Sequence, residues 1–74
     1  MVNPRAKCKV EPNPHAKVRM ADRSLSQSDI ERMVRGGVWI AEGGTDYDVT
    51  YQRWHIKVKT LQCLIRVKTV FLER

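Results

Sequence analysis

The chain has 74 residues, of which 42% are hydrophobic and 30% are charged. This composition is typical of one folded domain and excludes an intrinsically disordered chain. The longest apolar runs are three or four residues, too short for a membrane span. The net charge of +6 is uneven, because residues 36–52 sum to −3 and residues 53–74 sum to +5. A concentrated basic end is typical of proteins that bind nucleic acids.

Residues 1–13 are predicted to form a flexible N-terminal arm, and residues 14–74 a single domain. The arm contains Pro4 and Pro12 and has no periodic apolar pattern, although a short extended piece at residues 8–10 fits the sequence. Its positive charges are not followed by the apolar stretch of a secretory signal. We therefore expect a cytoplasmic protein that does not associate with a membrane.

The two cysteines, Cys8 and Cys63, are far apart and lie outside any CxxC spacing. A disulfide needs an oxidising compartment, so we expect two reduced thiols. Two histidines and two scattered cysteines do not form the close set of ligands that a structural metal requires. We expect neither a metal nor any other cofactor.

A first short helix is predicted to begin at Pro14. Asn13 suits the N-cap, and proline suits the first helical position because its missing N–H would be unpaired there. At 100° per residue, one arc of the helix contains Val18, Ala21 and Leu25, which we expect to face the core.

A second short helix is predicted to follow Ser26. Ser26 and Asp29 have the spacing of a capping box, and Gly36-Gly37 is expected to end the helix in a left-handed conformation. The residues between them form an apolar stripe at i, i+3 and i+4: Ile30, Met33 and Val34.

From Val38 onward the apolar period changes to two, which indicates strands. The first covers residues 38–41, and the last begins at Cys63 with its alternate residues toward the core. Between them, a turn at Gln52-Arg53 predicts a hairpin with these pairs: Tyr51–Trp54, Thr50–His55, Val49–Ile56, Asp48–Lys57 and Tyr47–Val58. The predicted fold is α+β, with two short N-terminal helices packed on a three- to four-stranded antiparallel sheet.

Five basic residues are predicted to share the sheet face that points away from the core. They are His55, Lys57, Lys59, Arg66 and Lys68. Exposed strands usually mix charges of both signs, whereas this set has only Asp48 as an expected neighbour. We therefore interpret these residues as a nucleic-acid-binding surface, with ordinary solvation as the alternative.

The basic face of the first helix is also predicted to be functional. His15, Arg19 and Arg23 fall on one arc, and the helix dipole favours a neutral imidazole that can accept a proton. The two guanidinium groups could hold a phosphate. As alternatives, His15 only hydrogen-bonds the helix start, and Arg19 pairs with Asp22.

The pattern H-x3-R-M-x2-R at His15, followed by HIKV and IRVKTVFLE, resembles domain-of-unknown-function family 4258 of small bacterial proteins. The resemblance covers residues 14–73. That family is similar in element order to the RelE and BrnT ribonuclease toxins. The resemblance therefore implies a toxin-like shape and a catalytic role for His15, Arg19 and Arg23.

Three functional interpretations follow. The first is a toxin-like RNA-binding protein that in its active form is a metal-free ribonuclease. Its partner would be RNA, which could be ribosome-associated, or an acidic antitoxin-like protein. The second is a non-catalytic module that binds nucleic acid or an acidic protein through the same surface. The third is a structural protein that forms a homodimer through an edge strand.

Overall fold

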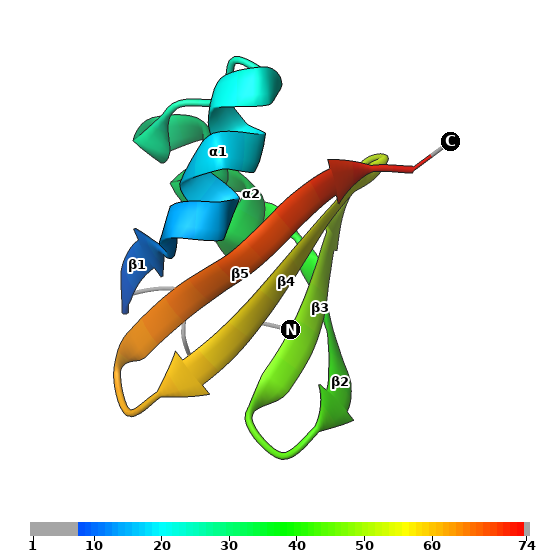
Figure 1. Cartoon of the computed structure of the whole chain (residues 1–74). Helices are drawn as coiled ribbons and strands as arrows, with labels where there is room; N and C mark the ends of the chain where they lie inside the picture. The colour runs from blue at the N-terminus through cyan, green and yellow to red at the C-terminus, as the bar shows by residue number, and fades with distance from the viewer. Residues whose placement is uncertain (1–7, 74) are drawn as a thin grey trace.

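The computed structural model describes residues 8–73 and has an α+β fold, as predicted. Its elements in chain order are β1 (Lys9–Pro12), α1 (Pro14–Asp22), α2 (Gln27–Gly36), β2 (Val38–Gly43), β3 (Asp46–Tyr51), β4 (Trp54–Leu61) and β5 (Leu64–Leu72). The strands form one five-stranded sheet in the order β1-β5-β4-β3-β2, and both helices lie over one of its faces (Figure 1). The sheet is larger than expected and is mixed, because β1 runs parallel to β5. Within residues 8–73, neither helix is long and apolar enough to cross a membrane.

Strand β1 lies in the segment that the sequence assigned to a flexible arm. It pairs with β5 from Lys9 opposite Leu64 to Pro12 opposite Val67, and the Asn13 N–H donates to the Val67 carbonyl at 2.9 Å. Four residues with a proline at their end carry little strand signal by themselves, so the partner strand decides the structure. The remainder of the predicted arm, residues 1–7, lies outside the described residues.

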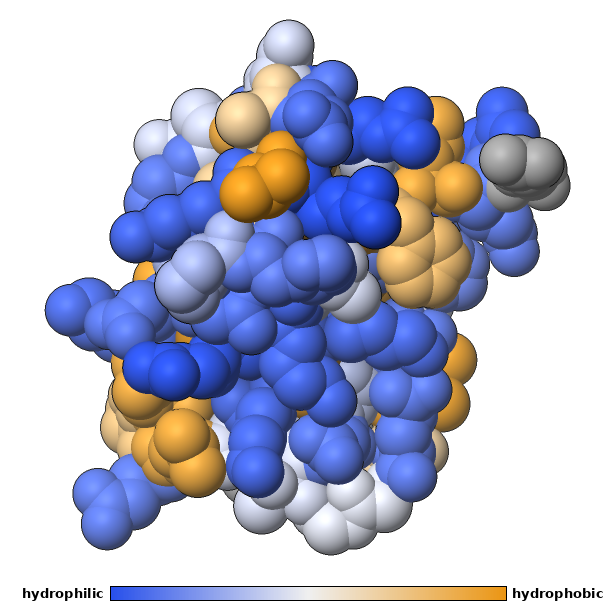
Figure 2. Space-filling view, viewed as in Figure 1, coloured by the Kyte–Doolittle hydropathy of each residue, from blue (hydrophilic) through white to orange (hydrophobic). Residues whose placement is uncertain are grey.

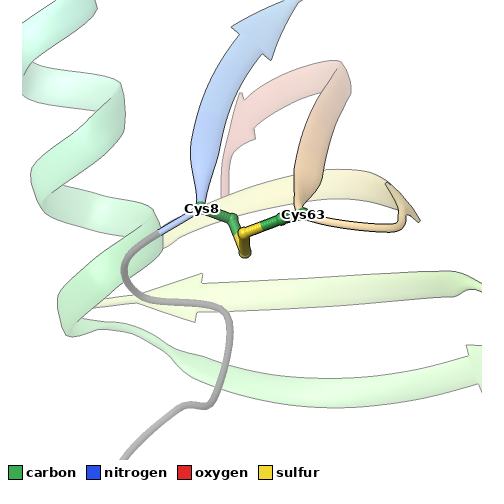
Figure 3. Close-up of a disulfide and its surroundings, with 2 residues drawn as sticks. All are labelled: Cys8 and Cys63. Carbon is green, nitrogen blue, oxygen red and sulfur yellow. A yellow bond between two sulfur atoms is a disulfide. The ribbon is translucent and has the colours of Figure 1, made fainter.

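A disulfide joins Cys8 to Cys63, so the expectation of two reduced thiols is wrong (Figure 3). The bond connects the residue before β1 to the turn between β4 and β5, across 55 positions in the sequence. Parallel pairing of β1 with β5 brings the two residues to the same end of the sheet. The sequence offered no sign of this pairing, because the neighbour of β1 was unknown.

Helix α1 starts as predicted but presents a different face to the core. The Asn13 side chain accepts a hydrogen bond from the Ala16 N–H at 2.7 Å, and Pro14 occupies the first turn. Ala16 and Met20 are buried, whereas the Val18 side chain is 60% exposed. The reason is that β1 leads directly into the helix and fixes which side meets β5.

Helix α2 confirms the capping box and the apolar stripe. Ser26 Oγ accepts from the Asp29 N–H at 3.1 Å, and Asp29 Oδ2 accepts from the Ser26 N–H at 2.9 Å. The left-handed end predicted at the two glycines is wrong, because Gly37 is extended, with φ −84°. Glycine is required there for close approach: a Cβ would lie 2.6 Å from a Val49 methyl and 2.9 Å from the Thr50 carbonyl.

The register of the β3–β4 hairpin is the one predicted from the change of parity at Gln52-Arg53. Strand β5 contains an irregularity that was not predicted: Lys57 pairs with Thr69, and the next residue, Val58, pairs with Val67. The extra residue shifts the alternation, so Val67 and Val70 are both buried against the helices. The opposite face of the sheet, which we call the outer face, is covered by no element of the described chain.

Candidate nucleic-acid interface

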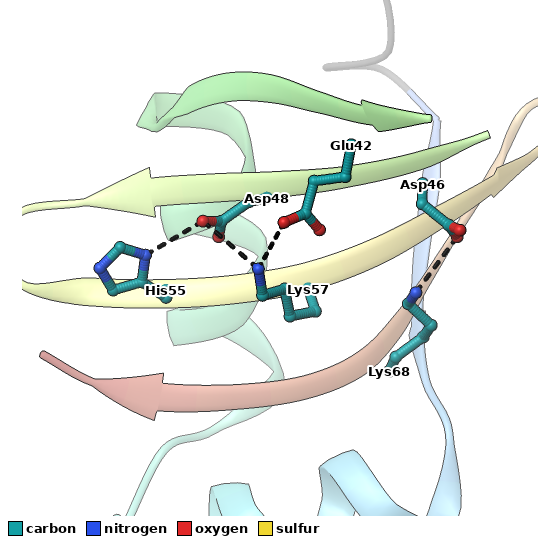
Figure 4. A network of polar contacts seen from close by, with 6 residues as sticks. All are labelled: Glu42, Asp46, Asp48, His55, Lys57 and Lys68. Atoms are coloured by element: carbon teal, nitrogen blue, oxygen red, sulfur yellow. Dashed lines mark hydrogen bonds and ion pairs between the residues drawn. The ribbon is translucent and has the colours of Figure 1, made fainter. Parts of the chain in front are cut away.

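The five predicted nucleic-acid-binding residues come from β4 and β5 and share the outer face, but most of them are already paired with carboxylates. Figure 4 shows part of this arrangement, in which acidic side chains from β2 and β3 meet basic ones from β4 and β5. We call the whole set the ion-pair network. Its members are His55, Lys57, Arg66 and Lys68, with Glu11, Glu42, Asp46, Asp48 and Glu73.

Lys57 occupies the centre of the ion-pair network. Its Nζ donates to Glu42 Oε2 at 2.6 Å and lies 3.6 Å from Asp48 Oδ2. The hydrogen bond to Glu42 raises the pKa of the Lys57 ammonium above its usual value, and the charge of Asp48 raises it further. An ammonium held between two acids has little capacity left for a phosphate.

The other members are paired in the same way. Lys68 Nζ lies 3.1 Å from Asp46 Oδ1, and Arg66 Nη2 lies 3.0 Å from Glu11 Oε1. Within residues 8–73, Lys59 is the member of the predicted set for which the structure shows no such partner.

His55 contacts two acids. Its Nδ1 lies 3.2 Å from Asp48 Oδ2, and its Nε2 lies 3.5 Å from Glu73 Oε1. The expectation that Asp48 would be the single acid near the basic set is therefore wrong. Glu42 and Asp46 lie on either side of the turn between β2 and β3, and Glu11 belongs to β1, a strand that the sequence did not predict.

Unpaired positive charge is instead found on α1. Within residues 8–73, the guanidinium groups of Arg19 and Arg23 make no hydrogen bond or ion pair, so the alternative in which Arg19 pairs with Asp22 is not observed. Both side chains line an open surface pocket of about 420 Å³, together with Asp22 and β5 residues 69–71. We call it the α1–β5 pocket.

The β5 side of the α1–β5 pocket is a free strand edge with an aromatic ring. Strand β1 pairs with β5 no further than Val67, so Thr69, Val70 and Phe71 have no strand beside them there. The Phe71 side chain is 42% exposed and stacks on the His55 ring, with centroids 5.1 Å apart and planes inclined by 11°. The pocket is thus lined by two arginines, by Asp22 and by Phe71, whose ring stacks on His55.

The third predicted catalytic residue does not join this pocket. His15 is exposed one helical turn before Arg19 and does not line the pocket, and within residues 8–73 its side chain makes no hydrogen bond. The structure therefore brings Arg19 and Arg23 together and leaves His15 apart from them. In the described part of the chain there is also no group of three or more histidine, cysteine, aspartate or glutamate side chains that could hold a metal ion.

Sequence reasoning did not identify Thr69 or Phe71 as site residues. The available signal was the spacing of Val67 and Val70, because apolar residues three apart in a strand break the period of two and indicate a bulge. Beyond that bulge, Phe71 moves to the outer face beside His55. In Figure 2 the visible surface is mainly hydrophilic, with separate hydrophobic spots rather than one continuous apolar patch.

A scan of this chain against models of protein families found no match, and searches of curated proteins and of solved structures found no similar protein. The resemblance to family 4258 therefore stays a prediction. The functional argument depends on the geometry of the chain itself.

Proposed function

We propose that this protein binds single-stranded RNA through the α1–β5 pocket. The observation that carries the proposal is that two arginines without acidic partners line the same pocket as an exposed aromatic ring, Phe71. Guanidinium groups bind phosphate through paired N–H donors. Unpaired bases stack on aromatic side chains in sequence-tolerant RNA recognition. One nucleotide offers both a phosphate and a base.

A single strand fits this pocket better than a duplex does. Bases of a duplex are stacked on one another, so the face of Phe71 has no base to contact. The ion-pair network occupies most of the basic side chains of the outer face, and within the pocket the cations that can contact phosphate are Arg19 and Arg23. Two contacts to a single strand predict a slope of about −1.4 when the logarithm of the binding constant is plotted against that of the salt concentration.

Of the interpretations drawn from the sequence, we propose the non-catalytic RNA-binding module rather than the ribonuclease. Cleavage through a 2′-hydroxyl needs a general base within hydrogen-bond reach of the reacting group. His15, the predicted base, does not line the α1–β5 pocket. We therefore expect bound RNA to stay intact and binding to survive the substitution His15→Ala.

The disulfide bears on where binding occurs. Disulfides persist in oxidising compartments, whereas the cytoplasm keeps thiols reduced. The Cys8–Cys63 bond does not fit the cytoplasmic location expected from the sequence, and that location stays a prediction. Binding is best measured with the oxidised protein.

The experiment is fluorescence anisotropy with a labelled single-stranded RNA and with the same RNA annealed to its complement. We expect saturable binding to the single strand, weaker binding to the duplex, a shallow salt dependence and no shortened product on a denaturing gel. The His15→Ala protein should behave like the wild type. Absence of binding to either RNA at low salt would overturn the proposal. Cleavage of the RNA would support the ribonuclease interpretation instead.

A further inference from the structure

Strand β2 forms the sheet edge opposite β1 and presents two large apolar side chains to solvent. Val38 is 65% exposed and Ile40 is 52% exposed. They pair with Thr50 and Asp48, so both lie on the outer face. Trp39, between them, points to the helix side, where its indole N–H donates to the Val34 carbonyl at 3.0 Å. Residues 38–41 therefore alternate regularly between the two faces and leave an unpaired row of backbone groups, and a bulge between Ala41 and Gly43 ends this stretch.

Edge strands of monomers usually carry lysine, proline or an inward charge that blocks pairing with another chain. Residues 38–41 of β2 contain none of these. The opposite edge is protected: it is formed by β1, which contains Lys9 and Pro12, and beyond Val67 by β5, where Arg19 and Arg23 line the adjacent pocket. Two copies joined at that edge would bring like charges together, whereas two copies joined at β2 would not.

We propose that a second copy of this chain pairs with β2, antiparallel, with the two Trp39 residues opposite each other. Directly opposed residues of an antiparallel pair point to the same face of the sheet, so an outer-face residue of one β2 must oppose an outer-face residue of the other. Because the outer-face residues Val38 and Ile40 have even numbers, the numbers of any two opposed residues must sum to an even number. Centring on Trp39 satisfies this condition and sets Val38 opposite the partner's Ile40, twice. The interface is isologous, with the same strand contributed by both copies.

The charges of β2 are compatible with this register. Glu42 is the single charged residue of the strand, and its carboxylate is bound to Lys57. In the proposed register Glu42 lies opposite the partner's Gly36, which is the last residue of α2, so the strand pairing runs from Gly37 to Ala41 and stops short of both Glu42 residues. The two Glu42 residues are then about 20 Å apart, given a rise of about 3.3 Å per residue. A small domain that buries little surface alone gains apolar contacts without a like-charge cost.

Dimerisation at β2 is independent of RNA binding. The α1–β5 pocket lies beside β5, and the sheet order β1-β5-β4-β3-β2 places two strands between β5 and the β2 edge. The dimer would be a continuous ten-stranded sheet in which both pockets stay open. Either proposal can therefore fail without the other.

The test is the mass of the oxidised full-length protein in solution, measured by light scattering over a series of concentrations. We expect twice the chain mass for the wild type, and the chain mass for Ile40→Lys, which places a charge in the interface. The control is Val18→Lys, which makes a similar change at a 60% exposed site on α1 and should stay dimeric. A monomeric wild type at every concentration, or a dimeric Ile40→Lys protein, would overturn the proposal.

A cross-linking measurement tests the register and does not depend on a disruptive substitution. Val38→Cys and Ile40→Cys proteins are mixed and treated with a short thiol-reactive cross-linker. We expect covalent dimers in the mixture and none in either protein alone, because residue 38 faces residue 40 across the interface. Cross-linking of Ile40→Cys with itself would contradict the Trp39-centred register, and no cross-linking in any sample would contradict strand pairing.

Discussion

The outer face of the sheet and the α1–β5 pocket contain the same kinds of basic side chain in opposite electrostatic states. On the outer face, Lys57, Arg66 and Lys68 each lie within ion-pair distance of a carboxylate. In the pocket, Arg19 and Arg23 make no such contact within residues 8–73. The comparison teaches that a count of positive charges does not locate an anion site.

Most surface ion pairs contribute little to stability, but they do occupy donors. A lysine bound to two acids must give up both contacts before it binds a phosphate, whereas an arginine without an acid gives up water alone. The difference therefore appears in binding rather than in folding. The following substitutions break or sharpen that difference, in order of decreasing effect.

The largest effect is expected from removing the disulfide, because β1 supports both regions. It leads into α1, which contains Arg19 and is followed at its C-cap by Arg23, and it supplies Glu11 to the ion-pair network. The bond closes a loop of 55 residues, so the Cys8→Ser/Cys63→Ser protein should lose about 4 kcal/mol of unfolding free energy. Urea denaturation measures this loss. A variant as stable as the wild type would mean that β1 does not depend on the bond.

The second effect concerns the aromatic half of the pocket. Phe71→Ala removes the exposed ring on which a base would stack, at a cost of about 1–3 kcal/mol, or roughly 5- to 160-fold in RNA affinity. The matched control is Leu61→Ala, at a site of similar exposure, 44%, next to the β4–β5 turn. If the two variants bind single-stranded RNA with equal affinity, base stacking on Phe71 does not contribute to binding.

A smaller effect is expected from exposing a cation that is now paired. Asp46→Asn leaves Lys68, next to the pocket residue Thr69, without its carboxylate. One additional phosphate contact should steepen the salt slope by about 0.7 and strengthen RNA binding at low salt. Glu31→Gln on α2 removes the same charge away from the sheet and serves as the control. An unchanged slope for Asp46→Asn would show that pairing does not limit Lys68.

The smallest effect is the pH dependence of the Lys57 ion pairs. The pKa of Lys57 is raised above the ordinary 10.5, so its stabilising contribution is fully present below pH 10.5 and is lost as pH rises through the folded pKa. We expect the stability difference between the wild type and Lys57→Met to shrink above pH 10.5. Lys59→Met, which removes a lysine without a carboxylate partner, should show no such change. Thermal denaturation at several alkaline pH values measures both differences.

Local patterns in the sequence were sufficient where near neighbours determine the structure. The Ser26–Asp29 capping box and the β3–β4 register follow from spacing and parity over a few residues, and both are confirmed. The buried face of α1 does not follow from periodicity alone. Val18 is the larger apolar side chain, yet Ala16 is buried because β1 fixes the orientation of the helix.

The candidate site, too, was predictable only where local spacing determines it. The basic arc at Arg19 and Arg23 follows from helical spacing, and both residues line the pocket. Among the acids of the ion-pair network, Asp48 was predicted opposite Lys57 and lies beside it. The others could not be assigned: Glu11, for example, reaches Arg66 through a strand pairing that joins distant parts of the chain. The role of Phe71 depends on the β5 bulge, which changes the face of every residue after it.

The most direct test of the account compares two variants that each lose two positive charges: Arg19→Ala/Arg23→Ala in the pocket and Arg66→Ala/Lys68→Ala in the ion-pair network. Their affinities for the same single-stranded RNA are measured at one salt concentration. We predict a loss of at least roughly ten-fold for the first variant, from the loss of charged hydrogen bonds to phosphate. The second should stay within about two-fold of the wild type. An equal loss in both variants, or a greater loss in the second, would contradict the claim that unpaired arginines form the RNA site.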